Sequence, residues 1–122
     1  MSKVSARVIA NDTKRNEFFE RLKLFCSQNS LNFTIAQNIP YWKIDGLFEI
    51  SIEIESCRVW NYGKWSEAYK FLFNQDFTIE WGLNDDISLC CYPECDNLDS
   101  YFVILHIPSD LFVPKPSKDI RH

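Results

Sequence analysis

The sequence predicts one α+β domain, in which a mainly antiparallel β-sheet carries two helices on one face. Two segments have apolar residues at helical spacing, and several others alternate apolar with polar residues or are short apolar runs that end in turn residues. No linker or internal repeat divides the 122 residues. The domain is predicted to span residues 1–107, and residues 108–122, which contain three prolines, are predicted to form an irregular tail.

The first part of the chain predicts a strand followed by an amphipathic helix. Residues 4–10 are rich in β-prone side chains, and residues 11–13 offer side-chain oxygens that can cap a helix. The helix is expected from Lys14 to about Ser27. Its buried stripe consists of Phe18, Leu22, Phe25 and Cys26.

Two further strands are expected next. Residues 31–39 read as a strand that ends at Pro40, and Asp45-Gly46 is a turn signal. Residues 48–55 show the clearest alternation in the chain. Their inward face is predicted to hold Phe48, Ile50, Ile52 and Ile54, and their solvated, acidic face Glu49, Ser51, Glu53 and Glu55.

The last part predicts a second helix and three strands. The helix is expected from about Ser66 to Asn74, with a stripe of Trp65, Ala68, Tyr69 and Leu72. Residues 77–83 alternate, with Phe77, Ile79, Trp81 and Leu83 predicted inward and Thr78, Glu80 and Gly82 outward. After a turn, residues 87–92 form a short strand, and residues 101–107 are apolar on both faces, as in a doubly covered central strand. The resulting order, β-α-β-β-α-β-β-β, fits a ferredoxin-like core with added strands.

The charge is distributed unevenly along the chain. Residues 1–44 have a balance of +4, whereas residues 45–99 hold twelve acids and three bases, a balance of −9. Such a surface either keeps the protein soluble or steers a cationic partner toward it. Nucleic acid is excluded as a partner of this surface, because its phosphates would be repelled.

Acidic and aromatic residues are therefore the candidates for binding a partner. Trp60 and Tyr62, close to Trp65, are either core residues or interface anchors, and Tyr41 and Trp42 form a second aromatic pair. The predicted partner-binding residues are Glu49, Glu53, Glu55, Glu80, Asp85, Asp86, Asp96, Asp99, Trp60 and Tyr62.

Motifs for catalysis, cofactors and metals are not recognised. Cys90, Cys91, Cys95 and His106 are the most metal-like group, but a second pair of ligands with zinc spacing is missing, so no metal or cofactor is expected. A cysteine nucleophile paired with His106 would need an activated thiolate. Phosphate loops, dinucleotide fingerprints and hydrolase elbows do not occur, and the chain is not predicted to be an enzyme. The odd number of cysteines and the polar start of the chain predict a reduced, cytoplasmic protein.

In size, acidity and aromatic content the chain resembles the immunity proteins of bacterial contact-dependent growth inhibition systems. This resemblance carries no diagnostic motif, so it assigns no role to any single residue. It implies a protein that binds and neutralises a cationic toxin domain, such as a nuclease, with carboxylates in the place of the phosphates that the toxin expects. The alternative is another non-catalytic interaction module, such as a phage-encoded inhibitor or an adaptor.

Overall fold

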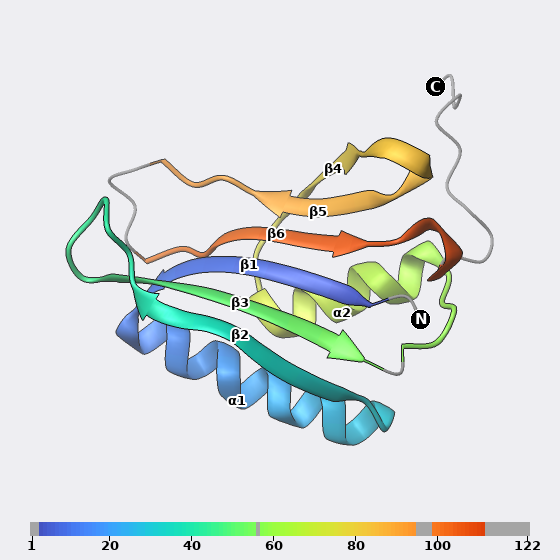
Figure 1. Cartoon of the computed structure of the whole chain (residues 1–122), viewed down its shortest axis with the longest axis horizontal. Helices are drawn as coiled ribbons and strands as arrows, with labels where there is room; N and C mark the ends of the chain where they lie inside the picture. The colour runs from blue at the N-terminus through green and yellow to red at the C-terminus, as the bar shows by residue number, and fades with distance from the viewer. Residues whose placement is uncertain (1–2, 56, 95–98, 112–122) are drawn as a thin grey trace.

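The computed structural model describes residues 3–55, 57–94 and 99–111. It has the predicted α+β fold: a six-stranded antiparallel sheet whose strand order is β2-β3-β1-β6-β5-β4, with two helices on one face (Figure 1). The elements are β1 (Val4–Asn11), α1 (Asp12–Asn29), β2 (Asn32–Pro40), β3 (Leu47–Glu55), α2 (Tyr62–Phe73), β4 (Thr78–Trp81), β5 (Ile87–Cys91) and β6 (Phe102–Ile107), with short 3₁₀ turns at Leu83–Asp85 and Ser109–Leu111.

The topology contains the predicted β-α-β-β-α arrangement and shows where the extra strands lie. Strand β3 pairs antiparallel with both β1 and β2. The other neighbour of β1 is β6, because the chain after α2 first runs to the far edge and forms the β4–β5 hairpin. Along the chain, the added strands β4 and β5 therefore lie between α2 and β6, the strand that pairs with β1.

Both helices begin at asparagine caps. The Asn11 side chain accepts a hydrogen bond from the Lys14 amide at 2.8 Å, and Asn61 accepts one from the Lys64 amide at 2.8 Å. These bonds satisfy amides that have no partner within the helix. The Asn61 cap starts α2 four residues earlier than predicted. The predicted buried stripes of both helices are confirmed.

The core lies between the helices and one face of the sheet. Cross-strand partners such as Val4 and Ile54, or Val8 and Val103, point to this face and are buried. The predicted inward residues of β3 are confirmed, with Phe48 only partly buried. The prediction that the last strand is covered on both faces is wrong. In β6, buried residues alternate with half-buried ones, because the described helices cover one face only.

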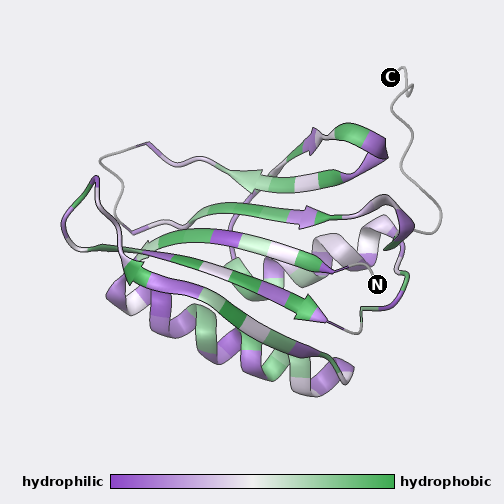
Figure 2. Cartoon of the chain, viewed as in Figure 1, coloured by the Kyte–Doolittle hydropathy of each residue, from purple (hydrophilic) through white to green (hydrophobic). Residues whose placement is uncertain are grey.

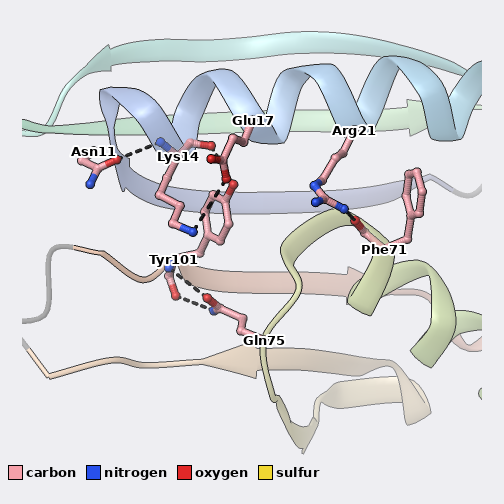
Figure 3. A network of polar contacts seen from close by, with 7 residues as sticks. All are labelled: Asn11, Lys14, Glu17, Arg21, Phe71, Gln75 and Tyr101. Carbon is pink, nitrogen blue, oxygen red and sulfur yellow. Dashed lines mark hydrogen bonds and ion pairs between the residues drawn. The ribbon is translucent and has the colours of Figure 1, made fainter.

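Tyr101 connects both helices to the sheet (Figure 3). Its hydroxyl donates a hydrogen bond to the Lys14 carbonyl at 2.7 Å, and its backbone exchanges two hydrogen bonds with the Gln75 side chain. Its ring contacts those of Phe18 and Phe73. One buried side chain thus fixes the start of α1 relative to the segment that follows α2.

The packed domain extends past the predicted boundary at Ile107. Leu111 is buried, and its carbonyl accepts hydrogen bonds from the Trp65 indole at 2.9 Å and from the Trp60 amide at 3.1 Å. Residues 108–111 therefore belong to the domain. The rest of the predicted tail, residues 112–122, lies outside the described residues.

The predicted burial of the residue 77–83 strand is also wrong for three of its four inward residues. Ile79, Trp81 and Leu83 are exposed, and Leu83 reaches 88%. Strand β4 has the predicted alternation, since Ile79 lies opposite the buried Leu89. It nevertheless forms the sheet edge farthest from α1 (Figure 1), where the helix layer gives these side chains little cover.

Candidate functional site

The sheet joins two halves of the chain that differ in charge. The first comprises β2, β3, β1 and α1, and its residues 3–55 hold seven acidic and seven basic side chains. The second comprises β6, β5, β4 and α2, and its residues 57–94 and 99–111 hold eight acidic and three basic side chains, a balance of −5. We call these the paired half and the acidic half. Since the strand order keeps each half contiguous, the charge is segregated in space.

Three predicted partner-binding glutamates lie in the paired half, where Arg7 of β1 and Lys3, the residue just before β1, compensate them. Arg7 Nε donates to Glu49 Oε2 at 2.8 Å. Lys3 Nζ lies 3.4 Å from Glu55 Oε1 and 3.9 Å from Glu53 Oε1. The predicted acidic face of this strand is present, but neighbouring cations partly compensate its charge. The reason is the antiparallel β1–β3 register, which brings Arg7 and the start of β1, next to Lys3, beside the β3 carboxylates.

Glu80 lies on the same sheet face as these glutamates but near the opposite edge. The register connects Glu80 with Ser88, Ser88 with His106, His106 with Ser5, and Ser5 with Glu53. Four strand spacings separate the two glutamates, or about 19 Å. The structure thus places Glu80 on a shared face with the β3 glutamates without forming one acidic cluster.

Among the four predicted partner-binding aspartates, those that the structure describes differ from one another in exposure and contacts. Asp86 is half-buried, its Oδ1 accepts a hydrogen bond from the Ser109 amide at 2.9 Å, and its Oδ2 lies 3.2 Å from His106 Nε2. It therefore holds the β5 entry against the end of β6. Asp85 is exposed and has a positive φ of 64°, which aspartate tolerates better than most residues. Asp99 is exposed, and Asp96 lies outside the described residues.

The predicted aromatic anchors lie mainly in the core. Trp60 is only 7% exposed, its ring centroid lies 4.6 Å from that of Trp65, and it packs edge-on against Phe25. Its predicted role in an interface is corrected accordingly. Tyr62 is partly buried at the start of α2. By contrast, Trp42 is 80% exposed in the β2–β3 loop.

Sequence reasoning missed an exposed apolar group on the β4–β5 hairpin. Ile79, Trp81 and Leu83 are exposed there, close in sequence to three exposed acids. Figure 2 shows hydrophobic and hydrophilic segments adjoining at this hairpin. We call this group the β4 patch; it consists of Asp76, Ile79, Glu80, Trp81, Leu83 and Asp85. The acids on both sides of β4 are a sequence signal for an exposed strand. Its position at the edge of the sheet, however, cannot be predicted from local sequence.

The cysteines do not form a reactive or metal-binding arrangement in the described part of the chain. Cys90 and Cys91 are neighbours on one strand, so their side chains point to opposite faces. Burial raises the pKa of both thiols and raises that of Cys26 to about 11, which disfavours the thiolate form. Within residues 3–55, 57–94 and 99–111, no three metal-ligating side chains gather. Cys95 is outside these ranges.

Two open surface hollows have volumes of about 890 and 430 Å³, and a smaller, more enclosed cavity lies near the end of the sheet. Its volume is about 260 Å³, and its lining includes Arg7, Tyr41, Lys43, Glu94 and Phe102. This volume is slightly below the range of most small-molecule sites, about 300–1,000 Å³. In the described residues, no helix combines the length and apolar character needed to cross a bilayer.

Comparisons with protein families, with curated proteins and with solved structures find no match to this chain. The class that the fold and the site define is a single-domain α+β protein with a segregated acidic half, in which the described helices cover one face of the sheet.

Proposed function

We propose that this chain is a non-catalytic immunity protein, which binds and neutralises a cationic toxin domain, such as a nuclease, through its acidic half. The observation that carries the proposal is the segregation of charge. The acidic half has a balance of −5, while the paired half of the same sheet is neutral. A basic protein approaching this molecule is therefore attracted to one side of it.

The β4 patch has the composition of a binding hot spot. Trp81 and Leu83 offer exposed apolar surface, and Asp76 and Asp85 flank the strand. Glu80 lies on the strand itself and points to the opposite face of this sheet edge, so a partner that wraps around the edge reaches both the apolar side chains and this carboxylate. Interfaces commonly combine a desolvated apolar centre with a charged rim, and the charges contribute mainly to the association rate and to specificity. A toxin with a basic nucleic-acid groove matches this chemistry, since carboxylates can occupy the positions of phosphates.

The alternative, another interaction module such as a phage-encoded inhibitor or an adaptor, is favoured by a different loop. Trp42 is the most exposed aromatic side chain of the described residues, and Lys43 Nζ lies 5.1 Å from its ring centroid. This loop belongs to the neutral paired half. A partner that binds there would depend little on acidic residues of the β4 patch.

The proposal is tested by co-expressing the chain with the product of the adjacent gene. We expect the two to co-purify and the chain to protect cells that produce the toxin. The variant Asp76→Asn/Glu80→Gln/Asp85→Asn should weaken both effects, because it removes three negative charges from the β4 patch and keeps the side-chain shapes. Asp86 is left unchanged, since its carboxylate holds Ser109 and His106.

A matched control removes three exposed acids from the paired half. The variant Glu17→Gln/Glu20→Gln/Asp45→Asn changes the net charge by the same amount and should retain binding and protection. Equal loss in both variants would show that net charge alone matters. Unchanged binding in both would move the interface to the Tyr41–Trp42 loop and contradict the proposed site.

A further inference from the structure

The sheet has two edge strands of very different character. Among the described strands, β2 has a neighbour only in β3, and β4 has one only in β5. Strand β2 spans nine residues, or about 30 Å, whereas β4 spans four. Exposed edges present unpaired backbone groups that can accept another strand, and proteins usually protect them with charge, proline, bulges or short length.

Strand β2 lacks the most effective of these protections. Its sequence, NFTIAQNIP, contains no charged residue. Eight of its nine residues are exposed, including Ile35 and Ile39. A register shift between Ile35 and Gln37 and the terminal Pro40 are its only irregular features in the described pairing. These features bend and limit the edge, but they place no charge against an incoming strand.

The edge is also held in place before any partner arrives. Arg15 of α1 donates a hydrogen bond to the Asn38 side chain at 3.1 Å, and its guanidinium carbon lies 3.6 Å from the Phe48 ring centroid. The Tyr41 amide donates to the Leu47 carbonyl at 2.8 Å, which closes the loop between β2 and β3. A strand fixed in this way loses little further conformational entropy when it pairs.

We infer that β2 is a self-association edge, along which two copies of this chain pair antiparallel to form a two-fold dimer with one continuous sheet. A second copy of the chain fits this edge because the paired halves of the two copies would face each other, and the paired half carries no net charge. The same approach keeps the two acidic halves at opposite ends of the joint sheet. Pairing through β4 would instead bring Glu80 and the acids beside it close to their copies, and like charges across strands are destabilising.

The dimer is closed. An isologous contact uses the β2 edge of both copies, and the described edges left over are the two short, acidic β4 strands. Further copies therefore have no comparable edge to add to. This inference does not depend on the proposed function, since the acidic half and the β4 patch stay accessible in the dimer.

Sedimentation velocity of the full chain from low to high micromolar concentration tests the inference. We expect a reversible monomer–dimer equilibrium. Ile35→Lys should raise the dimer dissociation constant by about tenfold or more, because it brings like charges together at the edge. Ile79→Lys is the matched control: both isoleucines are exposed, at 49% and 39%, on opposite edge strands, so this variant should dimerise as the wild type does.

Hydrogen exchange locates the contact. Peptides covering residues 32–40 should exchange more slowly at high concentration than at low, while peptides covering residues 78–81 should not change. Thr34→Lys, at another exposed position of β2, provides a second disrupting variant if Ile35→Lys fails to fold cooperatively. A monomer at every concentration, a dimer equally sensitive to Ile35→Lys and Ile79→Lys, or a dimer without protection of residues 32–40 would overturn the inference.

Discussion

The paired half and the acidic half bury the same kind of core and differ in what they show to solvent. Ile52 in one half and Leu89 in the other point to the helix-covered side of the sheet, and both are fully buried. On the opposite side of the sheet in the paired half, Lys3 and Arg7 compensate the β3 carboxylates. The acidic half as a whole has eight acids for three bases among its described residues. Apolar burial drives folding in both, so the charge pattern is free to serve another purpose.

The largest expected effect is a loss of stability of similar size when a buried residue of either half is truncated. Ile52→Ala and Leu89→Ala should each lower the free energy of unfolding by about 2–5 kcal/mol, because each leaves a cavity in a buried layer. Glu53→Ala should cost less than about 1 kcal/mol, since its ion pair with Lys3 is solvent-exposed. Urea denaturation measures all three. Similar costs for Ile52→Ala and Glu53→Ala would contradict the assigned faces of β3.

A smaller effect is expected from loosening the connection between the halves. Tyr101→Phe keeps the ring contacts with Phe18 and Phe73 but removes the hydroxyl that bonds the Lys14 carbonyl. We expect a loss of about 0.5–1.5 kcal/mol in the free energy of unfolding. The two hydrogen bonds to Gln75 use the backbone of Tyr101 and should persist. An unchanged stability in urea would show that the hydroxyl is not a connection between α1 and β6.

The same side chain predicts loss of stability in alkali. Burial, with a contribution from Glu17, raises the pKa of Tyr101 from 10.0 to about 12. The folded state therefore holds this proton more tightly than the unfolded state. Its contribution is fully present below pH 10 and is lost as the pH rises toward about 12. In thermal scans between these values, Tyr101→Phe should lose less stability than the wild type; parallel profiles would assign the loss to other groups.

How much of this organisation the sequence predicts depends on the range of the interactions. The β3 alternation and both helix stripes were predictable, because each follows from the period of one element. The compensation of Glu49, Glu53 and Glu55 was not, since it depends on the pairing of β1 with β3. Nor was the exposure of Trp81, which follows from the place of β4 in the strand order.

The smallest expected effect concerns self-repulsion within the acidic half. At low ionic strength, Asp76→Asn/Glu80→Gln/Asp85→Asn should raise the free energy of unfolding by a few tenths of a kcal/mol, about the scale of exposed charge pairs. Glu17→Gln/Glu20→Gln/Asp45→Asn should leave it unchanged or slightly lower, because Glu17 lies 3.7 Å from Lys14 Nζ. Added salt should remove the difference. Equal responses at low salt would mean that the two halves do not differ in local repulsion.

The association rate of the chain with its basic partner, measured by stopped flow over a range of salt concentrations, tests the functional claim most directly. The partner is the toxin domain recovered by co-purification. At low salt the β4-patch triple variant should associate about tenfold more slowly than the wild type, the paired-half control should match the wild type, and the difference should vanish at high salt. Indistinguishable rates for the two triple variants at low salt would contradict the claim that the acidic half guides binding.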